Sequence, residues 1–157
     1  MKENKYHKWP GQIVLILLSP ILLVIGLCIL VAYLILSIII YLSAWLFWNT
    51  RGIRLLYVYS NSPNWQEYIE HEIIPKLPEQ KIVLNWSERQ KWNKINFESL
   101  VFWHFGGYRS FNPMAVVIRP FRRAKVFRFY EAFRDYKHGK KETLTKLESD
   151  FFEALKK

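Results

Sequence analysis

The feature that most constrains this chain is a long apolar segment near its N-terminus. From Trp9 to Thr50 the sequence contains no Asp, Glu, Lys or Arg, and Ile13 to Trp48 is almost wholly apolar. Such runs are typical of membrane spans, because a bilayer core of about 30 Å requires roughly 20 apolar residues in a helix. The mean hydropathy of the whole chain is nonetheless only -0.04. Apolar and charged residues are therefore segregated: 1–12 is a basic flank, 13–48 a transmembrane segment and 51–157 a separate domain.

The 36 residues of the apolar run are more than one crossing needs. As a single helix they extend about 54 Å, against about 30 Å of hydrocarbon. Either one long helix tilts, kinks at Pro20 or continues beyond the bilayer, or two short helices form a tight hairpin. Basic residues flank both ends of the run, Lys2, Lys5 and Lys8 before it and Arg51 and Arg54 after it. Because Lys and Arg beside membrane segments prefer the cytosol, this favours the hairpin, with the C-terminal domain in the cytosol.

A cleaved secretory signal does not fit the apolar run, because the apolar core of such a signal has only about 7–15 residues. Trp9 at one end and Trp45, Phe47 and Trp48 at the other are typical of aromatic anchors at the bilayer surface. We therefore expect an integral protein of the plasma (inner) membrane. The single cysteine, Cys28, excludes an intrachain disulfide and a cysteine-based zinc site, and no cofactor is expected.

The 107 residues after the membrane segment suffice for one small core. Apolar and β-branched stretches predict five strands, at 53–59, 81–86, 100–105, 115–119 and 125–130. Apolar residues four apart between 65 and 77 predict a helix after the first strand, with Ser62 as its N-cap. A turn near Gly139 and an amphipathic helix over 144–155 complete the chain. Because a strand, a helix and a strand in succession form a parallel pair, we expect an α/β fold with a mixed or partly parallel sheet of about five strands.

Polar residues follow three of these strands, and ligands of α/β domains bind beyond the carboxyl ends of parallel strands. The candidate binding residues are Ser60, Asn61 and Ser62 after the first strand, Asn85, Ser87, Glu88 and Arg89 after the second, and His104, Arg109 and Asn112 after the third. The alternative for each is a structural role, such as a helix cap, a turn, a solvated surface or, for His104, packing among aromatic rings. No histidines have helical metal-ligand spacing, so no metal site is expected.

The strongest charge signal lies between residues 113 and 141. This stretch holds nine basic and two acidic residues, and its net charge of +7 is nearly all of the +8 that the domain carries. Beside a membrane segment, each basic residue near the surface attracts anionic lipid by about 1 kcal/mol. The predicted anion or lipid-headgroup patch is Arg119, Arg122, Arg123, Lys125 and Arg128. The alternative is that these side chains only face water while the interleaved phenylalanines fill the core.

Two functions fit these features. The first is a non-enzymatic, membrane-anchored cytosolic module that binds an anionic ligand (a nucleotide or lipid headgroup) or a partner protein, as a sensor or effector. The second is an integral membrane transferase or hydrolase that acts on a phosphorylated or lipid-linked substrate at the bilayer surface. The enzyme is expected to depend on Ser60, Glu88 or His104, and the module on the arginines. Nucleic acid is not an expected partner, because no motif of a nucleic-acid-binding domain is present.

Overall fold

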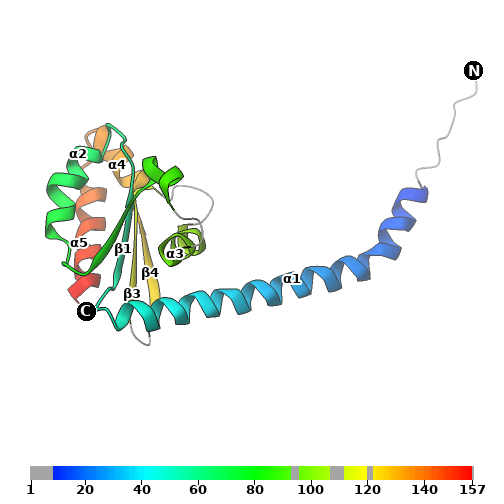
Figure 1. Ribbon diagram of the computed structural model, residues 1–157. Coiled ribbons are helices and arrows are strands. Elements are labelled where there is room, and N and C mark those ends of the chain that lie inside the picture. Colours follow the sequence, from blue (N-terminus) through cyan, green and yellow to red (C-terminus); the bar gives the residue numbers. More distant parts are fainter. Residues whose placement is uncertain (1–8, 93–95, 107–111, 120–121, 157) are drawn as a thin grey trace, which may run out of the picture. The chain divides into compact units, whose positions relative to one another are not determined.

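The chain comprises two compact units, Met1–Ile39 and Ile40–Lys157. The structure, a computed structural model, describes residues 9–92, 96–106, 112–119 and 122–156 (Figure 1). The described part of the first unit is a helix. The second unit is a small α/β domain that begins with the last ten residues of the same helix.

Helix α1 runs without a break from Trp9 to Asn49, with Pro20 inside it. The favoured hairpin is therefore wrong, and the chain forms the single long helix instead. The physical reason is that the apolar run has no Asn, Asp or Gly-Pro turn near its midpoint. Within α1, Leu18–Asn49 has a hydropathy of 3.1 and is the one helix of the described chain that is long and apolar enough to cross a membrane.

The last turns of α1 explain why the apolar run is longer than one crossing. Ala44 and Trp48 are 0% and 2% exposed, and Ile40 packs against the same core. These residues are four apart, so they lie on one side of the helix. The helix end is thus a core element of the domain. From Leu18 to Ile39, about 33 Å of helix remains, which matches one crossing of a bilayer core of about 30 Å.

The domain is built on a four-stranded mixed sheet in the order β2-β1-β3-β4. The strands are β1 (Leu55–Tyr59), β2 (Lys81–Asn85), β3 (Met114–Arg119) and β4 (Arg122–Arg128). β1 and β2 are parallel, whereas β3 is antiparallel to both β1 and β4. The predicted α/β class and the parallel pair are confirmed.

The crossover between β1 and β2 is helical but irregular. It consists of a short α-helix α2 (Gln66–Tyr68), a π turn (Ile69–Ile73) and a 3-10 turn (Ile74–Lys76). The helix begins at Gln66, with Trp65 as N-cap, so the predicted cap at Ser62 is wrong. The π turn ends at Ile73, two residues before Pro75, because proline lacks the N–H that the helical ladder needs.

One predicted strand is a helix. α3 (Phe97–Gly106) replaces the strand expected at 100–105, so the sheet has four strands rather than about five. The side chain of Asn96 accepts a hydrogen bond from the Ser99 backbone nitrogen at 2.8 Å and so caps the start of α3. The strand was predicted wrongly because the apolar run at 100–105 is continuous. Without alternating polar residues, such a run does not distinguish a strand from a buried helix.

The C-terminal part also contains one helix that was not predicted. The last strand ends at Arg128 rather than at Tyr130, and α4 (Tyr130–Lys137) follows. Gly139 makes the expected turn with a φ of +85°, a conformation that glycine adopts without steric cost. α5 (Glu142–Lys156) confirms the predicted C-terminal helix.

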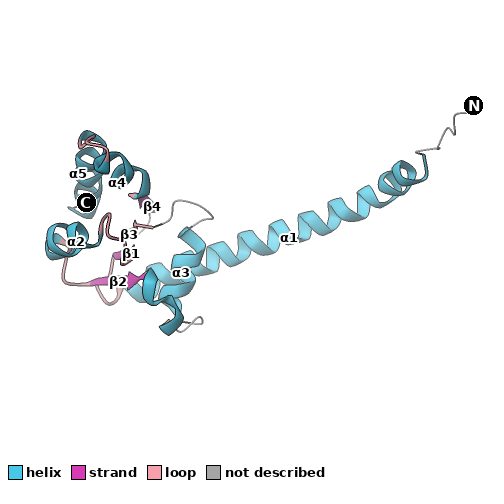
Figure 2. Cartoon of the chain, turned by 90° about the horizontal axis from the view of Figure 1, so that it is seen from above, coloured by secondary structure: helices cyan, strands magenta, loops and turns pink. Residues whose placement is uncertain are grey.

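The sheet has a core on each face. We call one the α5 face, where Leu55, Tyr57, Ala115 and Val117 pack with α4, α5 and the crossover, and the other the α3 face, where Leu56, Val58, Met114 and Val116 pack with α3 and the end of α1. Figure 2 shows α4 and α5 on one side of the strands and α3 on the other. Because both faces are covered, β1 and β3 are buried on both sides and are apolar almost throughout.

Candidate functional site

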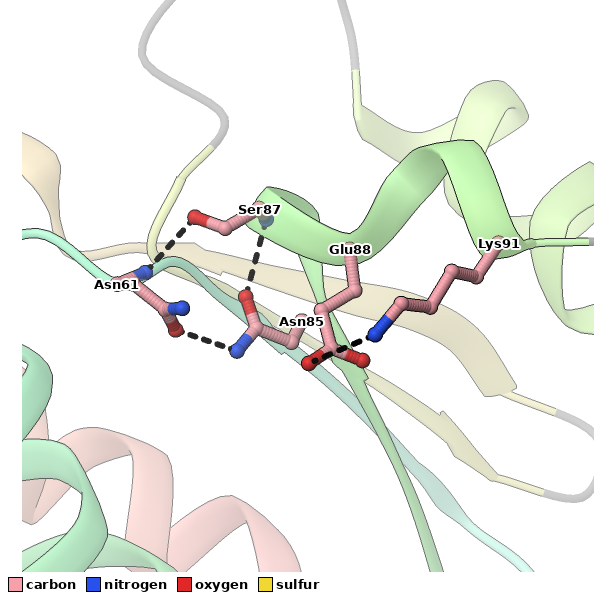
Figure 3. A network of polar contacts seen from close by, with 5 residues as sticks. All are labelled: Asn61, Asn85, Ser87, Glu88 and Lys91. Carbon is pink, nitrogen blue, oxygen red and sulfur yellow. Dashed lines mark hydrogen bonds and ion pairs between the residues drawn. The ribbon is translucent and has the colours of Figure 1, made fainter.

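The carboxyl ends of the parallel strands bring three predicted residues together (Figure 3). Asn85 Nδ2 donates to Asn61 Oδ1 at 2.6 Å. The Asn61 backbone nitrogen donates to Ser87 Oγ at 3.0 Å, and the Ser87 backbone nitrogen donates to Asn85 Oδ1 at 3.0 Å. The three side chains therefore tie the segment after β1 to the segment after β2. Their polar atoms are directed at one another, which is a structural role.

The two other polar side chains near this network are also engaged. Glu88 Oε1 lies 3.7 Å from Lys91 Nζ, and both side chains are exposed. Ser60, which is 8% exposed, accepts a hydrogen bond at Oγ from the indole nitrogen of Trp65 at 3.3 Å. Ser60 and Glu88 therefore both have partners within the local structure, Trp65 and Lys91.

The remaining predicted binding residues do not join this network. The Ser62 hydroxyl accepts from the Asn64 backbone nitrogen at 3.4 Å. His104 lies on α3, where its ring contacts Phe105 with centroids 4.8 Å apart, and burial lowers its pKa. Asn112 precedes β3, and its Oδ1 is buried without a hydrogen-bond partner in the described chain. Arg109 lies outside the described residues.

A tyrosine at the end of β1 remains a proton donor at neutral pH. Tyr59 donates from its hydroxyl to Glu70 Oε1 at 3.0 Å. Burial, followed by this hydrogen bond, raises the pKa of Tyr59 to about 12. The side chain therefore fixes the crossover to the strand and does not supply a base.

A cavity of about 530 Å³ opens directly after β2. We call it the tryptophan pocket, and its lining residues are Trp86, Arg89, Gln90, Trp92, Ser99 and Trp103. The Trp86 ring lies 5.9 Å from Trp92 and 5.6 Å from Trp103, in edge-to-face contacts at 75° and 71°. Phe102, which is 1% exposed, contacts all three rings at 5.2 to 5.6 Å. The walls are thus aromatic rings packed around a buried phenylalanine.

Two polar side chains of the pocket, Arg89 and Ser99, can contact polar groups of a ligand. The guanidinium of Arg89 stacks over Trp86, 4.9 Å from the ring centroid, and Nη1 donates to the Trp86 carbonyl at 3.3 Å. Ser99 is 1% exposed, and its Oγ is buried without a hydrogen-bond partner among the described residues. A buried hydroxyl left in this state costs about 1–3 kcal/mol. The pocket can therefore offer a cation and an unused hydroxyl to a ligand that also contacts aromatic rings.

The predicted basic patch is divided by the geometry of β4. Because side chains alternate along a strand, Arg122 and Arg128 share the α3 face with Ala124 and Val126, whereas Arg123 and Lys125 lie on the other side. Arg122, Arg123 and Lys125 are exposed. The phenylalanines at 127, 129 and 133 are buried, as the alternative interpretation expects.

The two other arginines of the patch have different surroundings. Arg128 donates from Nη1 to the Gly106 carbonyl and, at 3.3 Å, from Nη2 to the Phe105 carbonyl. It therefore caps the C-terminus of α3, where a cation complements the helix dipole. Arg119 is 7% exposed, and its Nε and Nη1 have no hydrogen-bond partner in the part of the chain that the structure describes.

Sequence reasoning missed most of the tryptophan pocket. Of its lining residues only Arg89 was a candidate, and Trp103 was assigned to a strand. One signal was available. Three of the seven tryptophans, at 86, 92 and 103, fall within 18 residues of sequence, which is typical of a local aromatic cluster.

No group of three or more metal-ligating side chains (His, Cys, Asp or Glu) occurs among the described residues. Comparisons with protein-family models, with curated proteins and with solved structures each find no match. The function is therefore argued from the geometry of the chain itself.

Proposed function

We propose that this chain is a single-span membrane protein whose cytosolic domain binds a small anionic ligand in the tryptophan pocket. The observation that carries the proposal is the pocket: three tryptophans, an arginine stacked on one of them and a buried hydroxyl without a described partner. Its position, directly after the parallel strand β2, is where α/β domains bind ligands. The chemistry suits a phosphate joined to a flat or apolar group, as in a nucleotide or a lipid headgroup.

The cytosolic orientation is supported by the charges next to the end of α1. Arg51 and Arg54 follow the helix directly, and both are exposed. The Tyr41 hydroxyl, on the last turns of α1, donates to the backbone carbonyl of Arg122, so the exposed start of β4 lies beside the helix. Basic residues near a membrane span favour the cytosolic side, which supports a cytosolic domain.

The geometry favours the binding module over the enzyme. Two of the three catalytic candidates have structural partners, because Ser60 accepts from Trp65 and Glu88 pairs with Lys91. The pocket, in contrast, presents groups suited to binding: rings for stacking, a cation and a hydroxyl.

The single-span topology is tested by cysteine labelling in intact cells. In a Cys28→Ser background, Lys5→Cys should react with an impermeant maleimide from outside, whereas Ser149→Cys on α5 should react only after permeabilisation. A chain that protects both positions would instead have both ends in the cytosol and would contradict the single crossing.

Ligand binding is tested by titrating the full-length protein in detergent with ATP, GTP and water-soluble short-chain phosphatidic acid. Quenching of tryptophan fluorescence reports occupancy. Arg89→Gln should weaken binding about tenfold, the loss of a charge-assisted hydrogen bond near 1.4 kcal/mol. Arg134→Gln, on α4, is the matched control and should leave binding unchanged. Saturation by nucleotides alone or by the lipid alone identifies the ligand class, and saturation by neither overturns the proposal.

A further inference from the structure

The exposed apolar side chains of the folded unit gather on one side. Among the described residues from Ile40 onward, six large apolar side chains are exposed, and five of them lie on the end of α1 or on α3. These five are Leu42, Leu46, Phe47, Leu100 and Trp103, which are 40% to 58% exposed. The sixth is Tyr130 on α4. Single exposed apolar residues are common on soluble proteins, but a group confined to one layer indicates contact with an apolar medium or partner.

The two helices that carry these residues pack against each other and against the α3 face. Trp48 and Phe97 make an edge-to-face contact with ring centroids 5.7 Å apart, and Phe47 lies 6.2 Å from the same ring. The apolar residues of α1 and α3 therefore belong to one layer. This layer includes the end of the one described helix that can cross a membrane.

Cationic residues border the apolar layer along the edge strand β4. Its first residue, Arg122, accepts a hydrogen bond at its carbonyl from Tyr41 on α1, and its last, Arg128, caps the C-terminus of α3. The strand thus follows the margin of the layer from one helix to the other. Arg122 is exposed there. Lys125 is less informative, because it lines a groove together with Asp150 and Glu153, which offset its charge.

We infer that the α3 side of the domain rests on the lipid leaflet into which α1 runs. Leu100 and Trp103 lie at the level of the headgroups, and Arg122 contacts anionic lipid phosphates. Leucine, tryptophan and arginine together are the composition that favours a bilayer interface, because the first two bury apolar surface while the cation stays with the headgroups. This inference rests on the membrane anchoring of the proposed function. Because Trp103 also lines the tryptophan pocket, the test follows Leu100 and not Trp103.

The inference is tested on the full-length chain in nanodiscs of phosphatidylcholine and phosphatidylglycerol that contain a headgroup nitroxide lipid. A fluorophore is attached, in a Cys28→Ser background, to Leu100→Cys or to Ser149→Cys. Quenching should be several-fold larger at 100 than at the control position 149, which lies on α5. In discs of phosphatidylcholine alone, which offer Arg122 no anionic lipid, quenching at 100 should fall.

Two results would overturn the inference. Equal quenching at 100 and 149 would mean that the domain moves freely above the bilayer. Weak quenching at 100 together with disulfide crosslinking of Leu100→Cys chains would mean that a second copy covers the surface. The anchoring is checked separately with a label on the native Cys28 and an acyl-chain nitroxide lipid. An unquenched Cys28 would refute the anchor itself, which distinguishes failure of the proposed function from failure of the docked orientation.

Discussion

The two faces of the sheet are covered by layers of different character. On the α5 face, α5 buries Leu144, Phe151 and Ala154, and the exposed residues on this helix are polar or charged. On the α3 face, the helices are apolar toward the sheet and also carry exposed apolar residues such as Phe47 and Trp103. An amphipathic helix needs only one apolar neighbour, whereas a helix that is apolar on both sides needs two. This difference is the observation behind the proposed contact of the α3 side with the bilayer.

The largest expected effect tests whether the end of α1 is as much a part of the core as α5 is. Trp48→Ala should lower the free energy of unfolding by about 3–5 kcal/mol, similar to Phe151→Ala on the opposite face, because both remove a fully buried aromatic ring. Chemical unfolding in detergent, followed by circular dichroism, measures both. Phe47→Ala is the control, because its side chain is 56% exposed and its removal should cost far less. A harmless Trp48→Ala beside a damaging Phe151→Ala would show that α1 only tethers the domain.

A second prediction separates a binding hydroxyl from a structural one. Ser99→Ala should stabilise the ligand-free protein by about 1 kcal/mol, because it removes a buried hydroxyl that has no described partner. The same change should weaken ligand binding in the pocket. Ser87→Ala should instead destabilise the protein by about 1 kcal/mol, because Ser87 Oγ accepts from the Asn61 backbone. Equal destabilisation by the two variants would remove the reason to assign Ser99 to a ligand site.

A third prediction concerns the pH dependence of the α5 face. Burial raises the pKa of Glu148, and its hydrogen bond from Tyr68, at 3.2 Å, only partly opposes this. The folded state therefore holds the Glu148 proton more tightly than the unfolded state, in which the pKa has its ordinary value of 4.5. As the pH rises from 4.5 through the raised pKa, the stability of the folded state falls. Glu148→Gln should raise the melting temperature at pH 7 and remove this contribution.

The matched control for Glu148 is an exposed carboxylate with the opposite shift. The hydrogen bond from Lys76, at 2.9 Å, lowers the pKa of Glu72, so its contribution to stability is present at neutral pH and is lost on acidification. Melting temperatures are measured between pH 4 and 8. Relative to the unaltered protein at neutral pH, Glu148→Gln should raise the melting temperature and Glu72→Gln should lower it. If the melting temperature of Glu148→Gln has the same pH dependence as that of the unaltered protein, the raised pKa of Glu148 makes no such contribution to stability.

The smallest effect on stability is expected at the exposed start of β4. Arg122→Gln should alter the free energy of unfolding by no more than about 0.5 kcal/mol, as is usual for an exposed side chain. It should nonetheless reduce headgroup quenching at position 100 in anionic nanodiscs. A large loss of stability would show that this arginine holds the fold rather than contacts lipid.

The sequence predicts those parts of the fold that depend on local pattern. The parallel pair follows from two apolar stretches separated by a helix, and the meeting of Asn61 with Asn85 follows from the shared carboxyl edge of those strands. The run at 100–105 is different, because continuous apolar residues fit a buried strand and a helix equally well. Only the cap at Asn96 distinguishes the two.

The tryptophan pocket could not be predicted for the same reason. It forms only when α3 is a helix that places Ser99 and Trp103 beside Trp86. The surplus length of the apolar run had a related origin, because Ala44 and Trp48 are buried in a cluster formed with later parts of the chain, and the Trp48 ring contacts Phe97, which lies 49 positions later. Patterns within a short window of sequence do not report contacts of this kind.

The central claim is that α1 is one continuous helix that enters the domain core at Ile40 and that, as proposed, crosses the bilayer before it. Hydrogen exchange along α1, measured in nanodiscs for the unaltered chain and for Trp48→Ala, tests this most directly. We expect amides from Leu18 to Ile39 to stay protected in both proteins, and amides from Tyr41 to Asn49 to lose protection in the variant together with β1. Protection that continues unchanged to Asn49 in the variant, or that breaks near the middle of the apolar run, would contradict the claim.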